Sequence, residues 1–493
     1  MRVSIKPVTL REAMKHQNKY ISWGMNKIHF ACLMEMRLGK TLANIRLVRE
    51  WCAFDKVWEG TESFPCLVVC PAAVIETWER ELREEGEFCV VIQGKTFDKR
   101  TEIAVNSAFS GKGRVWVLIN YESLLYTPGL TLLPWYFVGL DESPIIKNPK
   151  SKISQLCTGE HNFEDVRHRA ILTGLPCPES ELDLFQQFYF LYREFMGCVN
   201  YWEFRNKYFE LTWKGYEPKP GLKSKIQSYT HRRSFVLTRN QAGIGSKKIR
   251  EFRYCEMTKE QIKVYDKAEL EFIGLISNGK FEEDTERETD HVIVQRTWLA
   301  RIAGGCDPLG NFKWNPKVKE LLNLLKGELA NQPVVVWFRF DAEIKAVAQI
   351  LRKAGINLQT LTGDDNRVAK KNKQEWFRTS RIAGRVMLCQ AMKVAEYGVD
   401  MSSASVAINY SYVYSAHTIA QDDDRIVNPK KDDVLLYIYL VSRGSIDEDA
   451  VEAIRDKVRN AKMFMSKMQF NFRKRIEKKY GNTTDRTRSS RTR

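Results

Sequence analysis

The chain has 493 residues and a mass of 57.4 kDa, enough for two or three globular domains that each bury a hydrophobic core. With 43% apolar and 28% charged residues and no apolar run long enough to cross a bilayer, the composition excludes a wholly disordered or membrane-spanning chain. The net charge of +17 favours an anionic partner, such as nucleic acid or an acidic membrane surface.

Short apolar runs separated by helical patterns dominate the first third of the chain. They are rich in Val, Ile and Leu and mostly do not alternate with polar residues, which is typical of parallel strands buried on both faces. Because amphipathic helices are predicted between them, we expect a doubly wound α/β lobe over residues 1–240. The runs expected as strands are 29–34, 67–70, 115–119, 137–140 and 170–172.

Residues 180–300 are rich in aromatic and charged residues, and we expect them to be largely helical. We place a helical insertion of the first lobe within about 180–235 and a helical insertion or linker at 241–310, with an exposed loop at 213–226. Four aromatic residues recur here at helical spacing, which is more typical of a core than of a platform for stacking bases: Phe185, Phe188, Tyr189 and Tyr192.

A second series of apolar runs predicts another parallel sheet, in a second lobe at 311–456. Its expected strands are 334–338, 386–389, 406–410 and 435–441. Thirteen Lys and Arg residues against two acidic ones then give the basic tail, residues 457–493, a charge of +11. We expect this tail to bind DNA phosphates or a protein partner, with a solvated end as an equally good interpretation.

The eleven cysteines are scattered, and Cys66 and Cys70, which lie close in sequence, fall within an expected strand rather than a zinc knuckle. The N-terminus lacks the apolar stretch of a signal peptide. We therefore expect an intracellular, cytoplasmic protein with reduced thiols, without a membrane partner and as a monomer.

A glycine-rich turn, Leu38-Gly39-Lys40-Thr41, follows the first expected strand and opens a helical pattern. Phosphate binding requires backbone N–H groups turned inward, a lysine ammonium for the β- and γ-phosphates and a hydroxyl that ligates Mg²⁺. Since the strand–loop–helix context suits all three, we predict a nucleotide-binding loop, although the Gly-Lys-Thr triplet alone would be an ordinary turn before a helix.

Two adjacent carboxylates, Asp141 and Glu142, directly follow the expected strand 137–140. Because burying charge is costly, carboxylates at the end of a buried strand are expected to face the crevice where ligands bind. Asp141 would hold Mg²⁺ through water, and Glu142 would orient or deprotonate the attacking water. The alternative, a solvated start of a loop, becomes the weaker one in combination with Lys40.

These residues carry a resemblance to the superfamily 2 helicase-type ATPases of the Swi/Snf branch, over roughly residues 8–455. Met34–Thr41 resembles the family's Asp-Glu-Met-Gly-Leu-Gly-Lys-Thr loop, and Asp141–Pro144 with Ile146–Asn148 resembles its DEAH-type box. The compact form is similar to bacteriophage and bacterial members. Other segments resemble further family motifs in their order: Leu67–Pro71 with Trp78, Asn120–Glu122, Leu172–Pro176, Val335–Phe340, Leu361–Gly363, Gly398–Met401, Gln421–Arg425 and Gly444–Glu448.

The resemblance implies two RecA-like doubly wound lobes, with ATP and Mg²⁺ bound in the cleft between them. It implies that Leu38, Gly39 and Lys40 bind the nucleotide. Thr41 and Asp141 would bind it as well and hold the Mg²⁺. DNA would be contacted by its phosphate backbone, largely independently of sequence, through the motifs at Leu67–Pro71, Asn120–Glu122, Val335–Phe340 and Gly398–Met401.

The resemblance gives further residues of the first lobe roles in catalysis, in coupling nucleotide binding to DNA and in adenine recognition. Glu142 would be catalytic, and Thr173 and Gly174 would couple the nucleotide state to the DNA path. Gln17 resembles the glutamine with which the family reads adenine.

The second lobe would complete the site. The resemblance places Gly398 and Asp400 near the nucleotide, and it makes Gln421 and Arg425 catalytic groups that reach the γ-phosphate.

Three departures from the family pattern stand out. Arg37 replaces a loop glycine, and Pro144 replaces the histidine of the box. Asn428 occupies the position of a second arginine that acts as an arginine finger in the family, a group worth about 10³–10⁵ in rate. The Asp422-Asp423-Asp424 triplet before Arg425 adds negative charge near the expected phosphate site, with a solvated face as the alternative interpretation.

Three functions remain open from the sequence. An ATP-dependent translocase or helicase-like motor on duplex or branched DNA is favoured by the set Lys40, Thr41, Asp141 and Glu142. A catalytically weak or degenerate DNA-binding module is favoured by Asn428, Pro144 and the acidic triplet. An RNA helicase of the same superfamily is disfavoured by the long helical insertion and the Leu-Thr-Gly-x-Pro segment.

Overall fold

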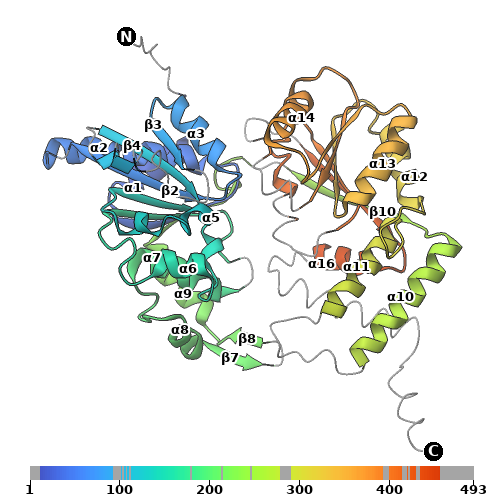
Figure 1. The fold of residues 1–493 in the computed structure, drawn as a ribbon, viewed down its shortest axis with the longest axis horizontal. Helices are drawn as coiled ribbons and strands as arrows, with labels where there is room; N and C mark the ends of the chain where they lie inside the picture. The colour runs from blue at the N-terminus through green and yellow to red at the C-terminus, as the bar shows by residue number, and fades with distance from the viewer. Residues whose placement is uncertain are drawn as a thin grey trace, which may run out of the picture. The chain divides into compact units, whose positions relative to one another are not determined.

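The structure is a computed structural model, and it describes residues 11–455 with gaps at 61, 93–101, 103, 104, 107, 110–112, 178, 179, 213, 214, 245, 246, 278–289, 392–398, 413–418, 420, 421 and 429–433. The basic tail and the predicted site residues Gly398 and Gln421 lie outside the described residues. The chain divides near residue 245 into two compact units, unit 1 before this point and unit 2 after it (Figure 1).

Unit 1 is built on a seven-stranded, entirely parallel sheet in the order β3-β4-β2-β5-β6-β1-β9. Its strands are β1 His29–Met34, β2 Ser63–Cys70, β3 Phe88–Ile92, β4 Gly113–Asn120, β5 Phe137–Asp141, β6 His168–Leu172 and β9 Ser234–Leu237. Its helices and short 3-10 turns are α1 Lys15–Gly24, α2 Lys40–Trp58, α3 Ile75–Glu84, α5 Tyr121–Leu124, η1 Pro128–Leu132, η2 Ser143–Ile146, α6 Lys152–Thr158, η3 Glu181–Asp183, α7 Leu184–Tyr192, α8 Tyr201–Tyr208 and α9 Leu222–His231.

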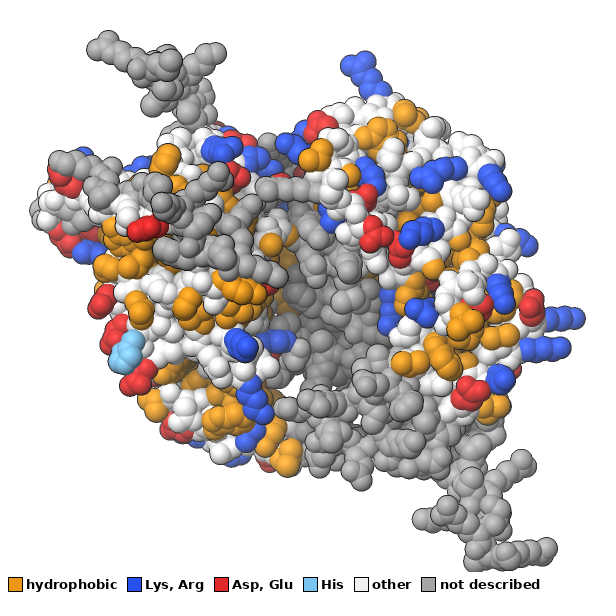
Figure 2. All heavy atoms as spheres, in the orientation of Figure 1, with side chains coloured by type: hydrophobic (Ala, Val, Ile, Leu, Met, Phe, Trp, Pro, Cys, Tyr) orange, Lys and Arg blue, Asp and Glu red, His pale blue; other side chains and the backbone are white. Residues whose placement is uncertain are grey.

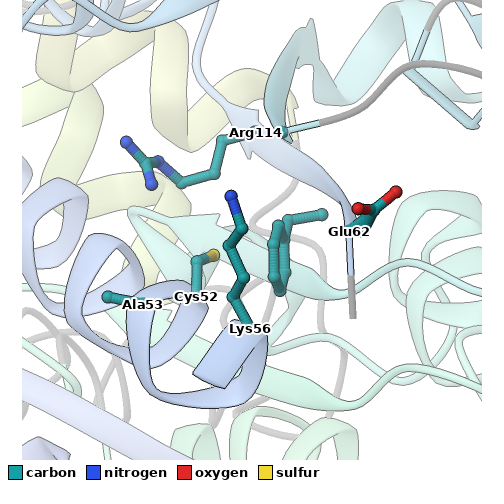
Figure 3. Close-up of a pocket in the computed structure, with 7 residues that line it drawn as sticks. Cys52, Ala53, Lys56, Glu62 and Arg114 are labelled. Carbon is teal, nitrogen blue, oxygen red and sulfur yellow. The ribbon is translucent and has the colours of Figure 1, made fainter. Parts of the chain in front are cut away.

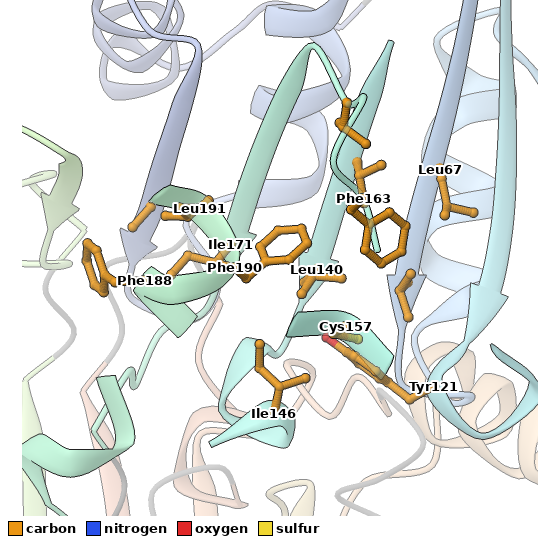
Figure 4. Packing of buried hydrophobic residues seen from close by; sticks show 14 of the residues in the cluster. Leu67, Tyr121, Leu140, Ile146, Cys157, Phe163, Ile171, Phe188, Phe190 and Leu191 are labelled. Carbon is orange, nitrogen blue, oxygen red and sulfur yellow. The ribbon is translucent and has the colours of Figure 1, made fainter. Parts of the chain in front are cut away.

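Both faces of this sheet are buried, because successive side chains of a strand point to opposite faces and both sets are apolar. In β2, Cys66 and Val68 pack in a cluster with α1, α2 and α3, while Leu67 and Val69 pack in a second cluster with α5, α6 and α7. Figure 4 shows the second cluster, in which Phe188 of α7 joins residues from β2, β5 and β6. A separate antiparallel hairpin is formed by β7 Phe209–Thr212 and β8 Gly215–Pro218.

Unit 2 has a six-stranded parallel sheet in the order β10-β15-β14-β11-β13-β12. Its strands are β10 Lys248–Cys255, β11 Val334–Phe338, β12 Leu358–Leu361, β13 Val386–Gln390, β14 Val406–Asn409 and β15 Leu435–Ser442. Its helices are α10 Lys259–Ser277, α11 Asp290–Gly304, α12 Pro316–Lys326, α13 Asp341–Lys353, α14 Arg367–Thr379 and α16 Ile446–Arg455. One face packs on α12 and α13, the other on α10, α11, α14 and α16.

The predicted α/β fold of two doubly wound parallel sheets is confirmed. Each strand expected from an apolar run lies within an observed one, except that the expected strand 406–410 extends one residue beyond β14. In the two parallel sheets, the four strands that the sequence did not indicate are β3, β9, β10 and β12, and each lies at an edge of its sheet. Edge strands are half exposed, as the mixed burial of β10 illustrates, so they lack the continuous apolar run of a central strand.

Two expectations about the helical segments change in the structure. Residues 241–310 were expected as an insertion or linker, yet β10 pairs along its whole length with β15 inside the second sheet, and α10 and α11 pack on that sheet. The exposed loop expected at 213–226 is wrong for its described part, since it contains β8 and the start of α9, whose Leu222 and Ile226 are buried.

The core interpretation of the aromatic residues in α7 is confirmed, because Phe185 and Phe188 are buried and Tyr189 and Tyr192 pack against the same cluster. Among the described helices, none is both long and apolar enough to span a bilayer.

Candidate nucleotide site

The predicted phosphate loop connects β1 to α2 at the carboxyl edge of the sheet. Gly39 caps α2 with φ +71°, a left-handed conformation that glycine adopts without strain. Arg37 is also left-handed, with φ +68°, at the position where the family has a glycine. A side chain in this conformation costs roughly 1–2 kcal/mol, so Arg37 lowers the stability of the loop.

Lys40, the first residue of α2, folds its side chain back over the loop. Its Nζ donates to the carbonyl oxygen of Met34 at 3.0 Å and to that of Glu35 at 3.5 Å. The ammonium group therefore lies beside the helix N-terminus, whose free amides and dipole attract anions. This is the arrangement that a phosphate-binding lysine requires.

Two buried side chains of α1 brace the loop from behind. His16 Nε2 donates to Leu38 O at 2.9 Å, and Gln17 Nε2 donates to Gly39 O at 3.3 Å. A Cβ on Gly39 would lie 2.3 Å from Gln17 Nε2, so any side chain there would displace the Gln17 amide. Gln17 Oε1 accepts from Met14 N, so both ends of its amide are engaged. Its role in reading adenine stays a prediction, and His16 is a residue that the sequence did not indicate.

Asp141 ends β5 and is buried, with 6% of its surface exposed. Its Oδ2 accepts a 2.7 Å hydrogen bond from Trp78 Nε1 of α3, and its Oδ1 accepts one from the backbone N–H of Glu142. Burial and the neighbouring Glu142 raise the pKa of Asp141 to about 6, and the Trp78 bond and Lys40 oppose the rise. The sequence indicated Trp78 only as part of a family motif, so its bond to the carboxylate was missed.

Glu142 stands at the turn after β5 in a left-handed conformation with φ +49°. Thr173, directly after β6, donates from Oγ1 to Glu142 Oε2 at 3.4 Å. A Cβ on Gly174 would lie 3.2 Å from Met36 N of the phosphate loop. Thr173 therefore contacts the Glu142 carboxylate, and Gly174 lies against the phosphate loop. Both follow β6, which lies between β5 and β1 in the sheet.

A buried glutamine of α7 forms hydrogen bonds to the turn after β5 and to the turn after β6. Gln187 Oε1 accepts from the hydroxyl of Ser143, which follows Glu142, at 2.7 Å. Its Nε2 donates to Pro176 O, in the turn after β6, and to Asp183 O, each at 2.7 Å. Gln187 was not indicated by the sequence, where it stands among the apolar residues of a core helix.

In unit 2, the segments that resemble two different family motifs lie side by side. The backbone N–H of Met401 donates to Arg425 O at 3.1 Å, and Asp400 Oδ1 accepts from Ser402 N. Asp400 and Arg425 are thus brought together within unit 2. That Arg425 and Gln421 act on a nucleotide stays a prediction.

The acidic triplet is not a solvated face, and that interpretation is wrong. Asp422 and Asp423 are 3% and 2% exposed, and burial raises the pKa of Asp423 to about 6 and that of Asp422 well above its usual range. Asp423 pairs with Arg250 at 3.4 Å and Asp424 with Lys248 at 3.0 Å. Both cations belong to β10, a strand that the sequence did not indicate.

The residues of unit 1 fit a nucleotide with Mg²⁺. Mg²⁺ prefers oxygen ligands and is usually held by one or two protein groups together with phosphates and water, which matches Thr41 and Asp141. Among the described residues, no cluster of three or more His, Cys, Asp or Glu side chains could hold a metal ion by protein ligands alone.

A pocket of about 260 Å³ in unit 1 lies elsewhere (Figure 3). It is lined by Cys52 and Lys56 near the end of α2 and by Arg114 at the start of β4. Lys40 stands at the other end of the 19-residue α2, and such a helix is about 28 Å long. This pocket is therefore separate from the phosphate loop.

Comparison with known proteins relates most of the described chain to models of two domains. A model of the SNF2-related domain matches residues 16–301, and a model of the helicase conserved C-terminal domain matches residues 316–430. The TATA-binding protein-associated factor BTAF1 of Arabidopsis thaliana is 24% identical over 71% of this chain and 18% of its own length. An uncharacterised ATP-dependent helicase of Mycoplasma genitalium is 22% identical over 90% of this chain and 41% of its own length.

The chain spans less than half the length of these curated relatives. A solved structure of the Sulfolobus solfataricus SWI2/SNF2 ATPase core in complex with dsDNA is 18% identical, covers 95% of this chain and 96% of its own, and superposes with a TM-score of 0.43. Because the SNF2-related model alone matches more than half of its residues, the chain belongs to the SNF2-related family of superfamily 2 helicase-like ATPases.

Proposed function

We propose that this chain is an ATP-dependent motor that hydrolyses ATP and translocates on duplex or branched DNA. One observation carries the proposal: Lys40, after β1, and the adjacent Asp141 and Glu142, after β5, are about 100 residues apart in the sequence but lie at the same carboxyl edge of the sheet. Only β6 separates the two strands. Ligands bind at this edge in open parallel sheets. The family membership supports the same function, and the name of the Mycoplasma genitalium relative refers to an ATP-dependent helicase.

The site residues of unit 1 have different roles in the proposed reaction. Lys40 and the amides at the start of α2 bind the phosphates, and Thr41 and Asp141 would hold Mg²⁺, which neutralises developing charge on the phosphates when bound. Glu142 accepts a proton from, or orients, the attacking water. Thr173 holds the Glu142 carboxylate by its hydroxyl and so positions it.

The test is ATP turnover by the purified chain, alone and with duplex DNA, single-stranded DNA or RNA. We expect turnover that duplex DNA stimulates most and that Lys40→Ala abolishes. Thr230→Ala is a matched control, since it removes a small polar group that bonds only to its own helix α9. Turnover that survives Lys40→Ala would refute the site. Strongest stimulation by RNA would move the chain to the RNA helicase alternative.

A second candidate function, a weak or inactive ATPase that serves as a DNA-binding module, is favoured by one observation in unit 2. Arg425 lies close enough to the buried Asp422 carboxyl to lower its pKa, although burial dominates, and Asn428 stands where the family has a second arginine. The variant Asn428→Arg distinguishes the active motor from the weak or inactive ATPase. A large rise in turnover supports a missing arginine finger, and an unchanged high turnover excludes this candidate.

A further inference from the structure

A cluster of cationic and aromatic side chains covers the part of unit 1 formed by the loop before α6, by α8 and β8, and by α9. Residues 201–233 contain eight Lys and Arg against three acidic residues. Figure 2 shows Lys and Arg side chains beside hydrophobic ones over α6 and α8. The cluster, here called the basic–aromatic patch, consists of Lys150, Trp202, Arg205, Lys207, Tyr216 and Lys225.

Arg205 is held between two aromatic rings. Its guanidinium carbon lies 4.7 Å from the centre of the Trp202 ring and 4.1 Å from that of Tyr216, which belongs to β8. Lys150 Nζ lies 5.6 Å from the same Trp202 ring. Cation–π contacts restrict the side-chain rotamers without neutralising the charge, so the cations are ordered before any partner binds.

Carboxylates do not neutralise these cations. Among the described residues, no ion pair joins Lys150, Arg205, Lys207 or Lys225 to an acidic side chain. Elsewhere in unit 1 the opposite holds, since Arg46 of α2 pairs with Glu85 at 2.7 Å. The patch therefore presents a local excess of positive charge, which attracts anions.

Apolar surface lies among the charges. Trp202 is 42% exposed, and Val199 and Leu211, which flank α8, are each 63% exposed. The base of the helix is rigid, because Asn200 caps α8 by accepting from Glu203 N and Phe204 is buried in the core. Exposed aromatic rings among cations on a rigid element are typical of surfaces that bind nucleic acid.

We propose that the basic–aromatic patch binds the phosphate backbone of DNA, as a contact additional to the motif segments expected to face DNA. The proposal rests on the proposed function and names a surface for its DNA partner. Each strand of a duplex carries a charge about every 3.4 Å, so four cations spread over one loop and two helices can meet several phosphates at once. Backbone contacts need charge and donors but no shaped pocket, and they carry no sequence preference.

The test measures binding of a labelled duplex by fluorescence anisotropy, with the full chain, without nucleotide and over a series of salt concentrations. The variant Arg205→Gln/Lys207→Gln/Lys225→Gln is expected to make the log–log salt dependence shallower by about 0.9 per lost phosphate contact, up to roughly 2.7 in total. A matched control, Lys319→Gln/Lys326→Gln/Lys353→Gln, removes the same charge from exposed positions of α12 and α13 in unit 2 and should leave the slope unchanged.

A second pair of variants tests the aromatic part. Trp202→Ala releases Arg205 and is expected to weaken binding about two- to fivefold, while Trp202→Phe keeps a ring and should retain most of the affinity. An unchanged salt slope in the triple variant, or an equal loss in the control, overturns the proposal. So does a triple variant that keeps its DNA affinity but loses binding to poly-glutamate, which would assign the patch to an acidic protein. Since the assay contains no ATP, its outcome is independent of whether the chain hydrolyses ATP.

Discussion

Replacing Trp78 by phenylalanine tests whether this buried indole controls the charge of Asp141. The substitution keeps an aromatic ring in the core but removes the N–H that donates to Asp141 Oδ2 at 2.7 Å. A hydrogen bond to a charged group is worth about 1.5–3 kcal/mol, and about 1.4 kcal/mol corresponds to a tenfold change in a proton equilibrium. Losing the bond should therefore raise the pKa of Asp141 from about 6 to between about 7 and 8.

The direction of the pH effect follows from which form of Asp141 works. The ionised carboxylate is the form that would hold Mg²⁺, so turnover is lost as the pH falls through the pKa of this group. At pH 7, the ionised fraction would fall from about nine-tenths to between about one-half and one-tenth, which lowers turnover by about two- to tenfold. A bound cation lowers the pKa in wild type and variant alike, so the difference between their midpoints is the quantity to compare.

The assay is the pH profile of kcat for ATP hydrolysis at saturating ATP and Mg²⁺, from pH 5.5 to 9. The acidic midpoint of Trp78→Phe should lie about one to two pH units above that of the wild type, and turnover should recover at high pH. Tyr121→Phe is the matched control, because its hydroxyl donates to the backbone oxygen of Asp141 at 2.9 Å and not to the carboxylate. Equal midpoints in Trp78→Phe and wild type, or an equal change in Tyr121→Phe, would refute the reasoning.

Three further predictions concern stability and DNA affinity. Asp141→Asn should stabilise the fold by up to about 3 kcal/mol at pH 7.5 and hardly at pH 4 in thermal unfolding, because the carboxyl, whose pKa rises from 3.8 to about 6 on folding, is ionised at a cost only at the higher pH. Lys317→Met should lower the free energy of unfolding in urea by about 3–5 kcal/mol, because it leaves the charge of Asp447, its buried partner at 2.6 Å, uncompensated. Adding Asp447→Leu should recover part of this loss, and a single variant as stable as the wild type would contradict the prediction. Deleting 457–493 should weaken DNA affinity and its salt dependence while basal turnover persists, and unchanged binding would assign the basic tail another role.

The parts of the fold that sequence reasoning found are those with a local signature. The central strands of both sheets are continuous apolar runs because they are covered on both faces, and the phosphate loop is a run of consecutive residues between a strand and a helix. The Asp141-Glu142 pair is recognisable for the same reason, as it directly ends such a strand.

The edge strands illustrate what local patterns do not contain. β10 carries Lys248 and Arg250 among its apolar residues, and its sequence alone does not distinguish it from an exposed segment. In the sheet, these cations pair with Asp424 and Asp423, and two of the three aspartates that looked solvated, Asp422 and Asp423, are buried.

The sequence by itself determined the two parallel sheets, the turn between β1 and α2 and the carboxylate pair after β5, since composition and period are properties of neighbouring residues. Only the tertiary structure decided which side chains tune that site. Trp78 and Asp141 are 63 residues apart, and Lys248 and Asp424 are 176 apart. Such pairs form only when packing brings separate strands and helices together, and burial then gives each hydrogen bond and ion pair an effect on charge that it would lack in water.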